Sequence, residues 1–96
     1  MAILPASLTL RDAAAAVDAL RRDCEATAGE PVWRIDAAPL DQLDTSAIAV
    51  LLECQRIAAA RKRTVELVGA SRRLIDLARL YGVEALIGAP VAAGDA

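Results

Sequence analysis

The 96-residue sequence has no histidine and no phenylalanine, and one tryptophan and one tyrosine are its only aromatic residues. Without histidine, neither a Ser-His nor a Cys-His nucleophile pair can be assembled. Each glycine stands alone, so the sequence also lacks the glycine-rich loops that bind nucleotide phosphates. These absences exclude the common catalytic arrangements, and we expect neither enzymatic activity nor a bound metal or other cofactor.

Charge and hydropathy exclude further classes of protein. The 11 basic and 13 acidic residues give a net charge of −2 and are scattered, unlike the basic surface typical of nucleic-acid binding. No apolar run approaches the roughly 20 residues that cross a bilayer, and the first residues do not resemble a secretory signal. Cys24 and Cys54 lie far apart in helical patterns, so we interpret them as reduced, half-buried thiols of a cytosolic protein.

What the sequence does contain is a regular alternation of strand and helix patterns. Residues 1–4 predict a short strand that Pro5 ends. Thr9 is predicted to cap the first helix, because apolar residues then recur at three- and four-residue steps. This apolar face consists of Leu10, Ala13, Val17, Leu20 and Cys24.

The alternation continues through the second half of the chain. A strand is predicted over residues 32–35, a helix over 45–61 and a strand over 64–68, and residues 84–87 add a last short turn or helix. Ser71 is predicted to cap a third helix that ends at Gly82. Its apolar face consists of Leu74, Leu77, Ala78 and Tyr81. The pattern predicts an α/β fold with a small, mostly parallel sheet and helices packed on it, in one domain over residues 1–88 with a flexible tail over 89–96.

The Asp-Thr-Ser corner (residues 44–46) is the most informative polar feature of the sequence. Asp44 is expected to cap the second helix by accepting a backbone N–H, a contact typically worth about 1 kcal/mol. Thr45 and Ser46 then lie in the first helical turn, where the helix dipole would tolerate a phosphate. A plain cap without regulation fits the same residues. Asp36, Asp41 and Asp44 lie close together and could in principle hold a cation, but Asp36 ends a strand and Asp44 is placed to cap a helix, so structural roles are favoured.

The second helix carries more apolar residues than one buried face requires. One stripe is expected to cover the sheet and consists of Ala47, Val50, Leu51, Cys54, Ile57 and Ala58. Ile48, Leu52 and Ala59 form a second stripe on the flank, bordered by Gln55, Arg56 and Arg63. Either the core extends further around the helix, or this flank contacts another protein.

These residues resemble the motif of the STAS domain family. The family pattern is apolar-Asp, a short loop, and then apolar-Asp-[Ser/Thr]-[Ser/Gly]-[Gly/Ala]-apolar, and it fits Ile35-Asp36 and Leu43-Asp44-Thr45-Ser46-Ala47-Ile48. The later segment Leu77-Ala78-Arg79-Leu80-Tyr81-Gly82-Val83 is similar to the MlaB-type branch. The likeness covers residues 31–88. The sequence departs from the family in Ala47, where glycine is usual, and in a first β-hairpin that is expected to be shortened.

The resemblance implies a non-catalytic cytoplasmic subunit. Such a subunit binds and supports the ATPase of a phospholipid ABC transporter that maintains outer-membrane lipid asymmetry, and it meets the inner membrane only through that complex. The contact would consist of Thr45, Ser46, Ile48 and Leu52. Thr45 matches the threonine that is important in MlaB-type subunits, and Ser46 matches the position phosphorylated in anti-sigma factor antagonists.

Two alternatives remain open from the sequence. The chain could be an anti-sigma factor antagonist that releases its partner when Ser46 is phosphorylated, and Thr45 is a second candidate for phosphorylation. It could also be a module that holds a lipid or nucleotide between helix and sheet. The Ala-rich core without phenylalanine argues against the large apolar cavity that the second alternative needs.

Overall fold

The structure is a computed structural model in which residues 2–82 are described. Its strands are β1 (Ala2–Ile3), β2 (Ser7–Leu8), β3 (Val32–Asp36), β4 (Gln42–Leu43) and β5 (Thr64–Val68). Its helices are α1 (Ala13–Ala26), α2 (Thr45–Ala60) and α3 (Arg72–Leu80). The turn expected at residues 84–87 and the tail expected at 89–96 lie outside the described residues.

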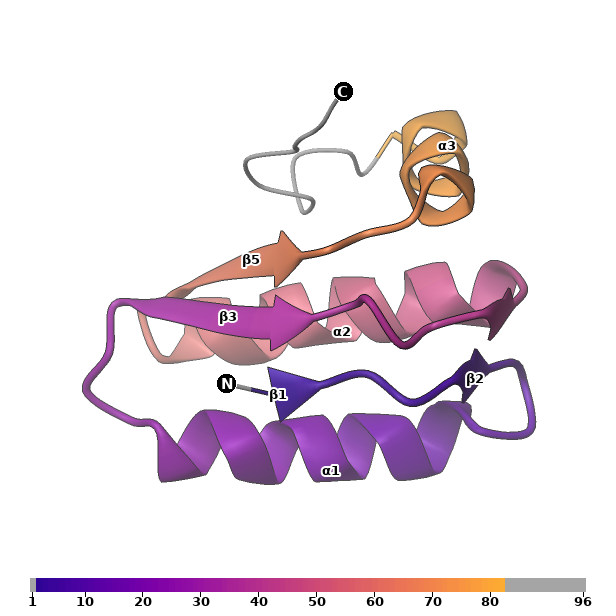
Figure 1. Ribbon diagram of the computed structural model, residues 1–96. Helices are drawn as coiled ribbons and strands as arrows, with labels where there is room; N and C mark the ends of the chain where they lie inside the picture. The colour runs from indigo at the N-terminus through magenta and orange to yellow at the C-terminus, as the bar shows by residue number, and fades with distance from the viewer. Residues whose placement is uncertain (1, 83–96) are drawn as a thin grey trace.

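The strands form two small parallel sheets. The larger has the order β1-β3-β5, and the smaller joins β2 to β4 further along the same strand direction (Figure 1). Because the order advances in one direction, right-handed crossovers place α1 and α2 on the same face of the larger sheet. The predicted α/β class is therefore confirmed. Between residues 2 and 82 every strand pair is parallel, so this part of the chain contains no β-hairpin.

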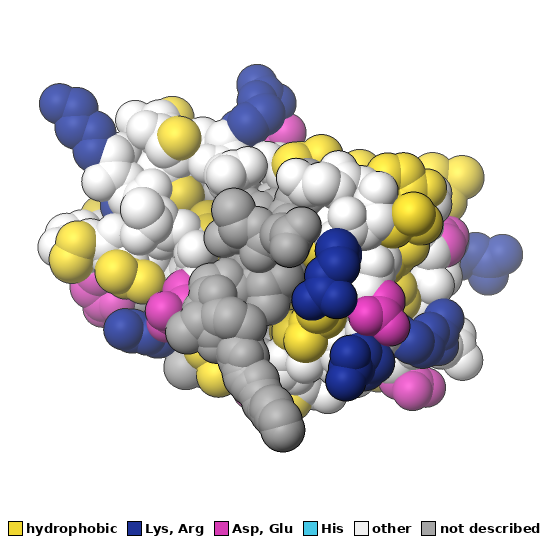
Figure 2. Space-filling view, turned by 90° about the horizontal axis from the view of Figure 1, so that it is seen from above, with side chains coloured by type: hydrophobic (Ala, Val, Ile, Leu, Met, Phe, Trp, Pro, Cys, Tyr) yellow, Lys and Arg dark blue, Asp and Glu magenta, His cyan; other side chains and the backbone are white. Residues whose placement is uncertain are grey.

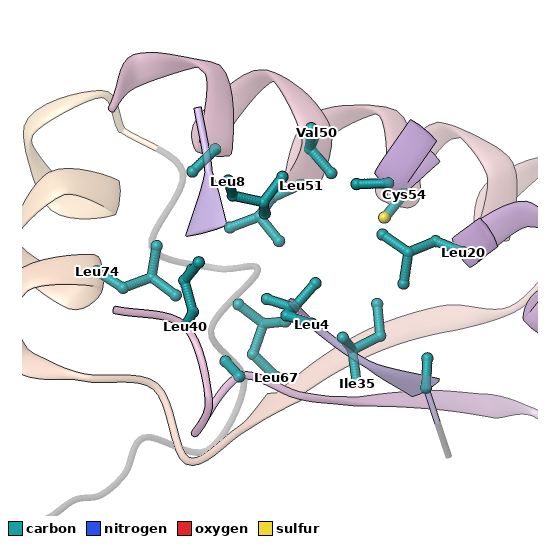
Figure 3. Close-up of a cluster of buried hydrophobic side chains, with 14 of the residues drawn as sticks. Leu4, Leu8, Leu20, Ile35, Leu40, Val50, Leu51, Cys54, Leu67 and Leu74 are labelled. Atoms are coloured by element: carbon teal, nitrogen blue, oxygen red, sulfur yellow. The ribbon is translucent and has the colours of Figure 1, made fainter. Parts of the chain in front are cut away.

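The core lies between this face of the sheet and the helices. Strand β3 alternates as a half-buried strand should, with Trp33 and Ile35 buried and Arg34 exposed between them. Figure 3 shows side chains from the strands and their loops facing Leu20 of α1, Leu51 of α2 and Leu74 of α3. The whole predicted stripe of α2 is buried: Ala47, Val50, Leu51, Cys54, Ile57 and Ala58. Small aliphatic side chains thus fill the space that aromatic residues occupy in many cores.

The predicted start of the first helix was wrong by three residues. Thr9 begins a tight turn, closed by a 2.9 Å hydrogen bond from the Asp12 N–H to the Thr9 carbonyl, and α1 starts only after Asp12. The Asp12 carboxylate accepts hydrogen bonds from the Thr9 N–H, the Thr9 hydroxyl and the Ser7 hydroxyl. These contacts, led by the Thr9 N–H, lower the pKa of Asp12 from its usual 3.8. Leu10 consequently points outward and is 79% exposed, instead of lying on the buried helix face.

The other predicted helix ends agree with the structure. The Ser71 hydroxyl oxygen accepts a hydrogen bond from the Leu74 N–H at 3.2 Å and caps α3. Gly82 adopts a φ of +71° after the last turn, the left-handed conformation that glycine favours there. Tyr81 differs from the prediction because it is 51% exposed and does not join the buried face of α3.

Arg63 also differs from the prediction, since it is buried rather than at the border of an exposed flank. Its guanidinium donates to the carbonyl oxygens of Glu30 (2.6 Å) and Cys24 (2.8 Å) and to the Thr27 hydroxyl (3.1 Å). It also lies 6.0 Å from the centre of the Trp33 ring. This Arg63 cluster (Arg63, Cys24, Thr27, Glu30 and Trp33) joins the end of α1 to the start of β5, where the carboxyl end of the helix dipole favours a cation.

Candidate functional site

The Asp-Thr-Ser corner lies at the end of the molecule where the parallel strands finish. Helices α1 and α2 both begin at this end, and the Arg63 cluster lies at the opposite end, where both helices finish (Figure 1). The carboxyl ends of parallel strands are the usual place for binding sites in α/β proteins, because loops and helix N-termini gather there. The fold therefore places the predicted corner where a site is most often found.

Asp44 holds this corner together with both carboxylate oxygens. Its Oδ1 accepts a 2.7 Å hydrogen bond from the Ser46 N–H, which confirms the predicted cap of α2. Its Oδ2 accepts a longer, 3.3 Å bond from the N–H of Leu10, which is 34 positions away in the sequence. Asp44 thus fixes the start of α2 and also ties it to the loop before α1. Because both oxygens are engaged in structural bonds, Asp44 is a poor candidate for a general base.

The two hydroxyls of the corner differ in accessibility. Thr45 is exposed and Ser46 is half-buried in the first turn of α2. Neither hydroxyl has a hydrogen-bond partner within residues 2–82. The positive end of the α2 dipole adds a favourable field for a hydrogen-bond acceptor or a negative charge. The corner can therefore offer the Thr45 hydroxyl to another molecule without first breaking a contact of its own.

The flank of α2 divides into a buried and an exposed part. Ile48 is only 5% exposed and belongs to the core, so the structure does not bring it to the surface with the other predicted contact residues. Leu52 is 39% exposed and stays accessible. Exposed residues form a line along α2 at steps of four and three: Thr45, Ala49, Leu52, Arg56 and Ala59. Gln55 and Ala60 are exposed outside this line. The core thus extends further around α2 than its first stripe, yet it leaves Ala49, Leu52 and Ala59 in solvent.

Two nearby aspartates take part in structural contacts, Asp36 through its carboxylate and Asp41 through its backbone. Asp36 Oδ1 accepts a 3.0 Å hydrogen bond from the Ala38 N–H, which fixes the loop after β3. The Asp41 backbone carbonyl accepts a 3.4 Å bond from Arg73 at the start of α3. Over the described part of the chain, no three His, Cys, Asp or Glu side chains are grouped closely enough to hold a metal ion. The geometry around the corner is thus that of ordered loops.

The cysteines lie in the interior, away from this corner. Cys24 and Cys54 are free and fully buried rather than half-buried. Burial raises the pKa of the Cys54 thiol from 9.0 to about 12, so the reactive thiolate is scarce at neutral pH. The Cys24 sulfur accepts a 3.2 Å hydrogen bond from Arg63. No local pattern signals this contact in the sequence, because the two residues are 39 positions apart.

The surface charges of the described residues are mixed in sign. Lys, Arg, Asp and Glu side chains alternate with apolar ones on the face seen in Figure 2, and no large area carries one sign alone. None of the helices between residues 2 and 82 is long and apolar enough to cross a membrane. This face does not present the continuous basic surface that nucleic-acid backbones attract.

Comparison with known proteins gives one match. A family model described as "Mlab, STAS domain" matches residues 5–88, which include every described helix and the whole corner. No curated protein and no solved structure matches the chain.

Proposed function

This chain belongs to the MlaB-type STAS domain family, and we propose that it is a non-catalytic subunit of a phospholipid ABC transporter. In this proposal it acts on the cytoplasmic side, binds the ATPase of the transporter and supports its assembly and activity. STAS domains are protein-interaction modules, so a protein partner follows from the family. The identity of the partner as the ATPase of a transporter that maintains outer-membrane lipid asymmetry is our proposal.

One observation carries the proposal. Both carboxylate oxygens of Asp44 accept structural hydrogen bonds, whereas the Thr45 hydroxyl has no partner among the described residues. The exposed Leu52 side chain lies on the same line of α2 as Thr45. A hydroxyl and an apolar side chain on the same helix face are typical of a protein contact, in which one central apolar contact is surrounded by hydrogen bonds. The described residues provide no base placed to activate either hydroxyl, which fits binding better than chemistry.

The test introduces a negative charge into the proposed contact. We expect Thr45→Glu and Leu52→Glu each to reduce co-purification with the ATPase subunit at least tenfold, because a buried, unpaired carboxylate is costly in an interface. Ala19→Glu is the matched control, since it adds the same charge at an exposed position of α1. Circular dichroism melting should show that all three variants are folded.

Two results would count against the proposal. If both folded variants bind the ATPase as well as the wild type does, the contact is elsewhere or the partner is different. If a cognate serine kinase phosphorylates Ser46, located by mass spectrometry, and the phosphate releases an anti-sigma factor, the chain is a partner-switching regulator. The half-buried position of Ser46 makes it less accessible to a kinase than Thr45.

A further inference from the structure

Leu10 has the most exposed large apolar side chain in the described part of the chain. It is 79% exposed, compared with 64% for Ile3 and 39% for Leu52. A single exposed leucine is common on protein surfaces and needs no explanation by itself. The exposure of Leu10 does need an explanation, because the turn that surrounds it is held in place by several hydrogen bonds.

The turn that carries Leu10 is fixed on both sides. The Asp12 carboxylate accepts bonds of 2.8 Å from the Ser7 hydroxyl, 3.1 Å from the Thr9 N–H and 3.0 Å from the Thr9 hydroxyl. The Asp12 N–H also donates to the Thr9 carbonyl at 2.9 Å. An apolar side chain on such a fixed turn loses little conformational freedom when a partner covers it.

The same turn is joined to the Asp-Thr-Ser corner. The Leu10 N–H donates to Asp44 Oδ2, while Asp44 Oδ1 holds the Ser46 N–H, so one carboxylate bridges the two segments. In Figure 1 the loop between β2 and α1 lies at the same end of the molecule as the start of α2. The exposed leucine and the exposed Thr45 therefore belong to one continuous surface.

We propose that Leu10 is an apolar anchor of the partner interface and enters an apolar pocket on the ATPase surface next to the Thr45 contact. This inference rests on the proposed function and adds a residue that the family motif does not contain. The occupant is a different protein rather than a second copy of this chain. The Leu10 turn is bonded through Asp44 to the corner where the ATPase is proposed to bind, so one partner can cover both segments.

The experiment measures the affinity of the full chain for the purified ATPase subunit by calorimetry. We expect Leu10→Ala to weaken the dissociation constant at least tenfold, because buried apolar anchors dominate such interfaces. Ile3→Ala is the matched control, an exposed aliphatic residue truncated on β1, and it should change the constant less than twofold. Leu10→Met should restore most of the affinity, since methionine adapts to apolar pockets.

Each other outcome has a distinct meaning. If Leu52→Glu abolishes binding while Leu10→Ala binds like the wild type, the inference is wrong and the proposed function stands. If neither variant changes binding to the ATPase, the proposed function is wrong, and the inference that rests on it is wrong too. If Leu10→Ala instead converts a dimer of this chain to a monomer in sedimentation, the occupant is a second copy and the inference is overturned.

Discussion

The two ends of the molecule use polar side chains in opposite ways. At one end, Arg63 joins the end of α1 to the start of β5, is 7% exposed and finds its partners within the chain. At the other end, Asp44 joins the start of α2 to the turn at Leu10, but the corner stays in solvent and the Thr45 hydroxyl has no described partner. The first arrangement is closed and stabilises the fold, whereas the second is ordered yet leaves groups free to bind.

This comparison predicts that stability and binding can be changed separately. Substitutions in the Arg63 cluster should lower the free energy of unfolding and leave the affinity of the folded chain unchanged. Substitutions on the exposed line of α2 should lower the affinity for the partner and leave the free energy of unfolding unchanged. Asp44 is the exception, because it both caps a helix and organises the binding surface.

The largest effect of a single substitution on stability at neutral pH is expected at Arg63. Arg63→Ala leaves the Cys24 and Glu30 carbonyl oxygens buried without their donor, and we expect a loss of about 3 kcal/mol in the free energy of unfolding. Urea denaturation followed by circular dichroism measures it. Arg61→Ala is the control, because its 3.1 Å ion pair with Glu25 is exposed and should contribute less than about 1 kcal/mol. Equal losses in both variants would contradict the closed arrangement around Arg63.

Buried Cys54 predicts a loss of stability at alkaline pH. Its pKa is about 12 in the folded chain against an ordinary value of 9.0, because burial disfavours the thiolate. Below pH 9 the thiol is protonated in both states and its contribution is complete. Above pH 9 only the unfolded chain releases the proton, so the free energy of unfolding should fall by about 1.4 kcal/mol per pH unit until about pH 12.

Urea denaturation of the wild type and Cys54→Ala between pH 8 and pH 11 tests this slope. The variant should show a flatter dependence on pH, even though the smaller side chain lowers its stability at every pH. Identical slopes would assign the alkaline loss to another group.

A smaller effect on stability is expected at Asp44. Asp44→Ala removes the acceptor of the Ser46 N–H and should cost about 1 kcal/mol in the free energy of unfolding. It also removes the bond that joins the Leu10 turn to the corner, so binding of the ATPase should weaken as well. Asp44→Asn is the control, since asparagine caps helices equally well and should retain most of the stability. Full binding by Asp44→Ala would show that the order of the corner does not matter for the partner.

Features set by local sequence could be predicted. Residues within a few positions of each other determine the Asp44 and Ser71 caps, the extent of α2 and the strands predicted at 32–35 and 64–68. These features agree with the structure because local hydrogen bonds and periodicity decide them.

Features set by contacts between residues far apart in the sequence could not be predicted. Leu10 fits a helical period, but the Asp12 carboxylate holds the preceding residues in a turn and delays the start of α1. Arg63 looks like a surface residue until the end of α1 meets it. Ile48 and Leu52 share one stripe in the sequence, and only the packing of the core separates them. Strand β4 has two residues and carries no periodic signal.

Hydrogen–deuterium exchange, measured by mass spectrometry with and without the ATPase subunit, tests the contrast between the two ends most directly. We expect slower exchange on binding in residues 9–12 and 44–52, which contain the Leu10 turn and the exposed line of α2. Residues 24–31 and 61–64, around the Arg63 cluster, should exchange at the same rate in both samples. Slower exchange confined to residues 24–31 and 61–64 would contradict the account, because it would place the partner on the closed end.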